Sequence, residues 1–118
     1  MIRIRIAVLA AVAALVVAVG AQAQTSGPTL NGTVGPGFTI TLTQGGKKVT
    51  SLKAGSYTFK IADKSSIHNF HLTGPGVNKD SGVATVGNQT WNLTLKKGTY
   101  KFVCDPHATI MKGSFTVK

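Results

Sequence analysis

Apolar and polar residues alternate with a period of two along much of the chain. The alternation is clearest in residues 38–42, 57–61 and 91–95, where every second side chain is apolar. A period of two is typical of β-strands with one buried face, because successive side chains of a strand point to opposite faces. These segments are therefore predicted to be strands, and the first of them is expected to direct Phe38 into the core.

Weaker patterns predict further strands in residues 67–73, 99–104 and 113–118, with a short one at 83–86. Turns rich in glycine separate these segments. No stretch after residue 37 supports a helix of three turns. Seven or eight short strands with frequent turns are typical of an all-β domain, and they predict a two-sheet β-sandwich or a small barrel.

The segment 1–23 has the layout of a secretory signal peptide. Two arginines precede an apolar run in residues 6–20, and Ala21-Gln22-Ala23 provides small residues two positions apart. Cleavage is expected after Ala23, which would make the mature protein periplasmic or secreted. The alternative is a retained membrane anchor, but the run is shorter than the roughly 20 residues that a spanning helix needs. We therefore expect no stable membrane insertion after cleavage.

Residues 24–37 differ in composition from the strands that follow. They are rich in Gly, Thr, Ser and Pro, and Gly35-Pro36-Gly37 breaks any regular structure. This segment is predicted to be a flexible leader. The remaining residues, 38–118, are predicted to form one domain, because a chain of this length supports one modest hydrophobic core but not two.

The chain after residue 23 is strongly basic. It contains eleven lysines against three aspartates, which gives a net charge of about +8. This part of the chain has no arginine, the residue that pairs best with phosphate and guanine, so nucleic acid is not expected as a partner. The lysines are dispersed and are expected to lie on solvated faces, with attraction of an acidic protein partner as a secondary role.

The single cysteine of the sequence lies in YKFVCDPHATIMKG, residues 100–113. An unpaired thiol is a liability in an oxidising compartment unless it is buried, paired between chains or occupied. The strand pattern places Cys104 on the apolar face of its strand, at the core or its rim. His107 and Met111 follow within eight residues. Thiolate, imidazole and thioether together form a soft ligand set, which favours copper.

A trigonal copper site needs a second imidazole, and His68 and His71 are the other histidines of the sequence. In a strand over residues 67–73, His68 would share the apolar face with Phe70. His71 would then point to solvent as a surface histidine. His68 is therefore the preferred candidate.

Other interpretations of Cys104 and His107 stay open at this point. Half of a zinc site would have the same spacing, but structural zinc takes four Cys or His ligands and methionine is not a usual donor. Covalent haem would require a CxxCH motif, which the sequence lacks. A cysteine protease normally has its nucleophile and base far apart in sequence. The last interpretation is a buried structural cysteine beside an incidental histidine.

Two segments in combination resemble the cupredoxins, the small blue copper proteins such as plastocyanin, pseudoazurin and amicyanin. YKFVCDPHATIMKGSFTV resembles their C-terminal ligand loop, and the HN of IHNFHL resembles their upstream ligand histidine and the asparagine that follows it. LKAGSYTFKI resembles the strand before that histidine. The resemblance covers about residues 38–118. It implies a Greek-key β-sandwich and one Cu(I)/Cu(II) ion, with His68, Cys104 and His107 as equatorial ligands and Met111 as the weak axial ligand.

The resemblance further implies that Asn69 ties the two ligand-bearing loops together and that electrons pass through a partly exposed His107. The expected function is that of an exported type 1 copper protein, a monomer that carries single electrons between redox partners. It is not expected to be an enzyme, because the four ligands leave no position for a substrate. Three residues separate His107 from Met111, which differs from both the plastocyanin-like and the amicyanin-like spacing.

Two other functions stay open from the sequence. One is a periplasmic protein that stores or delivers copper. The other is a cupredoxin-like module without metal that binds other molecules. Copper-dependent colour, and its resistance to a mild chelator, would distinguish these two functions from electron transfer.

Overall fold

The structure, a computed structural model, describes residues 27–118. The predicted signal peptide and its cleavage after Ala23 lie outside these residues. The described part contains ten strands, two of them only two residues long, and a one-turn 3₁₀ helix. The elements are β1 (Thr29–Val34), β2 (Ile40–Gln44), β3 (Lys47–Lys48), β4 (Ser51–Leu52), β5 (Gly55–Asp63), β6 (His71–Gly74), β7 (Val77–Asp80), β8 (Gly87–Leu95), β9 (Gly98–Val103), η1 (Asp105–His107) and β10 (Lys112–Val117).

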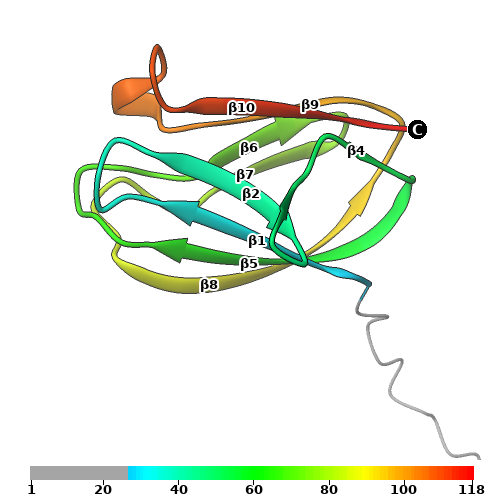
Figure 1. The fold of residues 1–118 in the computed structure, drawn as a ribbon, viewed down its shortest axis with the longest axis horizontal. Coiled ribbons are helices and arrows are strands. Elements are labelled where there is room, and N and C mark those ends of the chain that lie inside the picture. The colour runs from blue at the N-terminus through cyan, green and yellow to red at the C-terminus, as the bar shows by residue number, and fades with distance from the viewer. Residues whose placement is uncertain (1–26) are drawn as a thin grey trace, which may run out of the picture.

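The strands form two sheets that face each other as two layers (Figure 1). One sheet has the order β3-β2-β1-β5-β8 and the other the order β4-β10-β9-β6-β7. Most neighbours are antiparallel, whereas β1 pairs with β5 and β10 with β4 in parallel. The predicted all-β Greek-key sandwich is confirmed.

The prediction of a flexible leader over residues 24–37 is wrong for residues 29–34. Residues 29–34 form β1, which lies between β2 and β5 and pairs with β5 over its whole length. The core-facing positions of β1 are Leu30, Gly32 and Val34, and both apolar side chains are fully buried. Because the middle core-facing position is Gly32, which has no side chain, the apolar alternation of β1 is not visible in the sequence. A Cβ atom there would lie 2.6 Å from Ile61 Cδ1 and 2.9 Å from Phe70 Cε2, so any other residue would force these two side chains to shift.

The core lies between the sheets and is rich in aromatic rings. Phe70 stacks on Phe102 with 5.4 Å between ring centroids, and Tyr100 stacks on Phe115 at 5.3 Å. The prediction that Phe38 faces this core is wrong. The residue precedes β2, and its side chain is 56% exposed.

The weaker strand predictions are confirmed only in part. Of the strand expected at 67–73, only residues from His71 onward pair in a sheet, as β6. No strand forms at 83–86, where Val83 and Val86 are exposed. The chain instead forms β7, which the sequence pattern does not predict because three of its four side chains are exposed.

Three of the connections at the end of the sandwich opposite the C-terminus carry the predicted ligands and Phe38 (Figure 1). They are the β1–β2, β5–β6 and β9–β10 connections, which bring together Phe38, His68 and Cys104 to Met111. Within residues 27–118, no helix has the length and apolar composition that crossing a membrane requires.

Candidate metal centre

The β9–β10 connection is a tight loop closed by backbone hydrogen bonds. The Cys104 amide donates to the Met111 carbonyl at 3.0 Å, which joins the two ends of the loop. Inside it, the His107 amide donates to the Cys104 carbonyl at 3.0 Å, and the Met111 amide donates to the His107 carbonyl at 2.9 Å. Pro106 lies in the first turn of η1, where the missing N–H costs no hydrogen bond. These hydrogen bonds therefore hold the loop residues in fixed positions.

Three ligand-type atoms converge at this loop. Cys104 Sγ lies 3.6 Å from His68 Nδ1 and 3.6 Å from His107 Nδ1, and the two nitrogens are 3.1 Å apart. His68 and Cys104 are fully buried, whereas His107 is half-buried. One side chain distant in sequence, His68, thus meets the local Cys-His pair, whereas His71 is not in this cluster.

These separations fit a single metal ion. With metal–sulfur and metal–nitrogen bonds of about 2.3 and 2.0 Å, as in zinc sites, a trigonal arrangement puts sulfur and nitrogen about 3.7 Å apart. The nitrogens would then lie about 3.1 to 3.5 Å apart for bond angles of about 100° to 120°. Because the three observed distances match this triangle, one ion can contact all three atoms at once.

The fourth predicted ligand, Met111, is also at this end of the sandwich. Its side chain is fully buried, and its backbone is paired with that of Cys104 on one side and His107 on the other. The spacing of three residues after His107 therefore still brings Met111 back to the base of the loop.

The β1–β2 connection supports the imidazole of His68. The ring of Phe38 lies edge-on to both His68 and His107, with centroids 5.2 and 5.0 Å apart. His68 Nε2 is buried and has no hydrogen-bond partner among the described residues. The polar contacts of this ring are therefore made through Nδ1, which faces Cys104 and His107. The sequence pattern does not reveal this contact of Phe38 with the histidine rings, because the alternation predicts a core-facing position for Phe38.

Gly35 also fits closely against His68, and it yields a testable prediction. Its φ is +71°, and a Cβ atom would lie 3.0 Å from Ser65 Cβ and 3.3 Å from His68 Cδ2. We expect Gly35→Ala to lower the free energy of unfolding by about 1–2 kcal/mol, because the left-handed conformation is strained for alanine. We also expect the visible spectrum of the copper-loaded protein to change, because the added methyl group displaces the His68 ring.

Gly45→Ala is the matched control for this prediction. Gly45 has φ +55°, but nothing lies within 4 Å of its Cβ position. Its variant should show a similar loss in urea unfolding with an unchanged spectrum. Identical spectra for both variants would mean that Gly35 does not position His68.

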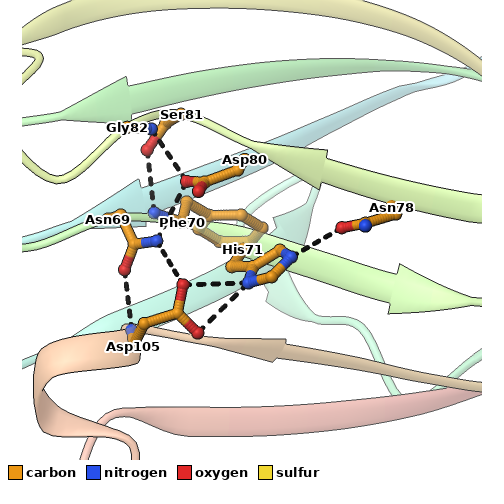
Figure 2. A network of polar contacts seen from close by, with 8 residues as sticks. All are labelled: Asn69, Phe70, His71, Asn78, Asp80, Ser81, Gly82 and Asp105. Atoms are coloured by element: carbon orange, nitrogen blue, oxygen red, sulfur yellow. Dashed lines mark hydrogen bonds and ion pairs between the residues drawn. The ribbon is translucent and has the colours of Figure 1, made fainter.

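Asn69 connects the two ligand-bearing loops, as the resemblance implied. The fully buried side chain accepts a hydrogen bond from the Asp105 amide at 2.7 Å and donates to the Asp105 carboxylate at 2.7 Å. Its amide nitrogen also donates to the Asp80 carboxylate at 2.9 Å. Figure 2 shows Asn69 between β7 and the loop that follows Cys104. The residues next to His68 and Cys104 are therefore locked together.

His71 takes part in the same network, and it is less exposed than the sequence predicted. Its side chain is 24% exposed, with Nδ1 at 2.9 Å from the Asp105 carboxylate and Nε2 at 2.6 Å from Asn78 Oδ1 (Figure 2). The bond to Asn78 and the charge of Asp105 raise the pKa of His71 above its usual 6.5, although burial opposes them. Burial also opposes the shift at Asp105, but the hydrogen bonds from Asn69 and His71 hold the pKa of that carboxyl below 3.8.

All three acidic side chains of the sequence lie around this network. Asp80 and Asp105 accept from Asn69, while the buried Asp63 accepts from Ser81 Oγ at 3.0 Å. Ser81 Oγ in turn accepts from the Phe70 amide at 2.8 Å. Counting charges along the sequence does not predict this clustering, because the three aspartates lie in β5, β7 and η1.

Comparisons with known proteins agree with this geometry. Residues 33–118 match the model of the family described as copper binding proteins, plastocyanin/azurin family. No curated protein matches the chain.

Among solved structures, the copper protein rusticyanin is similar in fold, with 24% identity, a TM-score of 0.57, and coverage of 79% of this chain and 80% of that chain. A rusticyanin variant with a histidine replaced by methionine has 27% identity and a TM-score of 0.52, with 79% and 80% coverage. One with a methionine replaced by glutamine has 26% identity and a TM-score of 0.52, again with 79% and 80% coverage.

Proposed function

Because the chain belongs to the plastocyanin/azurin family of copper-binding proteins, we propose that it is an exported type 1 copper protein that carries single electrons between redox partners. Its cofactor is one copper ion. The observation that carries the proposal is the convergence of one sulfur and two nitrogen atoms within 3.6 Å of one another.

The assigned ligands are His68, Cys104 and His107 in the equatorial positions and Met111 in the axial position. The thiolate and thioether sulfurs suit Cu(I), and imidazole is acceptable to both oxidation states. Copper, when bound, supplies the one-electron couple between Cu(II) and Cu(I). This assignment is supported by the distances among the three equatorial atoms and by the burial of Met111 at the base of the loop.

The surroundings of the ligands favour fast electron transfer. Cys104 and Met111 are tied by a backbone hydrogen bond, and Asn69 fixes Asp105, the residue after Cys104. Ligands held in this way move little when the charge of the site changes, which keeps the reorganisation that accompanies electron transfer small. The protein is not proposed to be an enzyme, because four side chains occupy the coordination positions that a substrate would need.

His107 is the proposed point of electron entry and exit. It is half-buried, whereas the other equatorial ligands are fully buried. Phe38 and Ile110, which are 56% and 65% exposed, lie on the β1–β2 connection and in the ligand loop. A partner protein that covers them would approach His107. The excess of lysines favours partners with an acidic surface, which would increase the rate of encounter at low salt.

Export and a monomeric state complete the proposal. Residues 1–23 carry the features of a signal peptide. An oxidising compartment is compatible with the chain, since its one cysteine is buried and is assigned to copper. A mature protein beginning at Gln24, located in the periplasm or outside the cell, is the expected product.

Addition of Cu(II) to the mature protein tests the function. We expect intense visible absorption from the thiolate-to-copper transition, which Cys104→Ser should abolish because serine offers no thiolate. Met111→Leu is the matched control in the same loop, and it should keep the absorption with an altered band, because all three equatorial ligands remain. Absence of colour in the unmodified protein would support a metal-free module. Rapid loss of colour to a mild chelator would support copper storage or delivery.

A further inference from the structure

His71 is joined to the ligand loop through one residue. Its Nδ1 lies 2.9 and 3.1 Å from the two carboxylate oxygens of Asp105, and Asp105 directly follows Cys104 in the chain. The Asp105 amide is held by Asn69, which directly follows His68. The charge of His71 therefore lies close to His68 and Cys104, two of the proposed copper ligands, although His71 touches neither.

Both ring nitrogens of His71 face oxygen acceptors. Nδ1 faces the carboxylate of Asp105, and Nε2 faces Asn78 Oδ1 at 2.6 Å (Figure 2). A neutral imidazole has one N–H and can satisfy only one of these acceptors, whereas an imidazolium donates to both. The site is thus built to accept a second proton on His71, and partial exposure of the side chain lets that proton come from water.

The charges around His71 favour the same state. On the outer face of its sheet it is next to Asp105 from η1 and Asp80 from β7. The cations on this face are Lys101, opposite Thr73, and Lys112, opposite Val103 on the far side of β9. Lys79, the single cation of β7, lies over the ring of Trp91 instead. The acidic groups are therefore the nearer ones.

We propose that His71 is a positioning residue whose protonation is coupled to reduction of the copper site. The inference rests on the proposed electron-carrier function. When the site gains one electron from a reduced partner protein, the proton affinity of His71 rises, and a molecule in which His71 is neutral can take up one proton from water, which offsets the added negative charge in that molecule. When the electron leaves, the proton returns to water. Linkage requires the reverse effect as well: protonated His71 favours the reduced site.

Voltammetry of the copper-loaded protein as a function of pH tests the inference. The reduction potential should be constant at low pH, fall as pH rises through the titration of His71, and become constant again. The equilibrium constant for reduction should fall by about twofold to tenfold in total, the range for charges separated by one or two side chains near a protein surface. Absence of a copper wave would contradict the proposed function itself, whereas a wave with a constant potential would contradict only this inference.

Two variants separate His71 from other groups. His71→Gln keeps a donor for Asp105 but cannot titrate, so its potential should show no fall over the pH range in which that of the unmodified protein falls. Lys101→Gln is the control, because it removes a neighbouring charge and leaves His71 in place; the fall in potential with rising pH should persist in this variant. Persistence of the pH dependence in His71→Gln would assign it to another group, such as His107, and would overturn the inference.

Asn78→Asp provides a test that does not remove His71. A carboxylate opposite Nε2 stabilises the imidazolium, so the fall in potential should move to higher pH. NMR titration of His71 in the Cu(I)-loaded and Zn(II)-loaded proteins gives an independent readout, because both ions are diamagnetic and differ by one charge. We expect the higher pKa with Cu(I). Equal values in the two forms would contradict the coupling.

Discussion

A chain that begins at Phe38 is expected to remain unfolded, whereas a chain that begins at Gly27 is expected to fold. The shorter chain lacks β1, which lies between β2 and β5 in the middle of its sheet. It loses two fully buried side chains, Leu30 and Val34, worth about 1.5–3 kcal/mol each. It also loses the backbone ladders to both neighbours. Since a domain of this size is stable by only about 5–15 kcal/mol, this loss is expected to exceed its total stability.

Circular dichroism and urea unfolding of the two metal-free chains would measure this effect. Leu30→Ala in the longer chain supplies a graded version and should cost about 2–5 kcal/mol through the cavity it leaves. Thr29→Ala is its control, because Thr29 is exposed, and should change stability by less than about 0.5 kcal/mol. Cooperative unfolding of the chain from Phe38 at the same urea concentration as the longer chain would show that β1 is dispensable.

Asn69→Ala is expected to have the second largest effect, on both stability and copper retention. The substitution removes three hydrogen bonds, two of them to carboxylates, and leaves the Asp105 amide without its acceptor. We expect the metal-free protein to lose about 3 kcal/mol of unfolding free energy, because bonds to charged groups are stronger than average. Copper affinity should fall by about 10- to 100-fold, as is typical when residues that orient metal ligands are removed.

Asn88→Ala is the matched control for this prediction. Asn88 lies exposed at the start of β8, where loss of its amide should change stability by less than about 0.5 kcal/mol. Urea unfolding measures the first effect, and competition with a copper chelator measures the second. If Asn69→Ala and Asn88→Ala hold copper equally well, the bonds of Asn69 serve the fold alone and do not hold the ligands.

The fold class could be predicted from the sequence, but β1 could not. Strands β5 and β8 show regular alternation because three successive alternate positions in each carry large apolar side chains, at 57, 59 and 61 and at 91, 93 and 95. In β1 the middle core position is Gly32, whose missing side chain makes room for Phe70 and Ile61. The main partner of β1 is a parallel strand about thirty residues away. In a hairpin, a turn motif between the two strands indicates the pairing. The parallel pairing of β1 with β5 has no such local signal in the sequence.

The residues of the candidate site could be found because three of them are close in sequence and chemically distinctive. A strand over residues 67–73 predicts a buried His68, and the side chain is fully buried. The segment before His71 is not a strand, however, and Asn69 is buried together with His68 and Phe70. Alternation along a strand thus predicts the burial of His68 but places Asn69 on the wrong face.

The contacts of Phe38 and His71 depend on three-dimensional proximity alone. Phe38 reaches the two histidines because the β1–β2 and β9–β10 connections lie at the same end of the sandwich (Figure 1). His71 meets Asp105 because β6 pairs with β9, a pairing between strands that are not consecutive. Sequence spacing carries no information about either contact.

The closure of the ligand loop affects how the site can diversify. The last pair of the β9–β10 ladder is Val103 with Lys112, and the Cys104 amide bonds to the Met111 carbonyl just beyond it. Residues 105–110 therefore project past a finished hairpin and contribute nothing to its register. On the proposed function, we expect insertion or deletion in this tip to change the potential of the copper site while the pairing of the two sheets is kept.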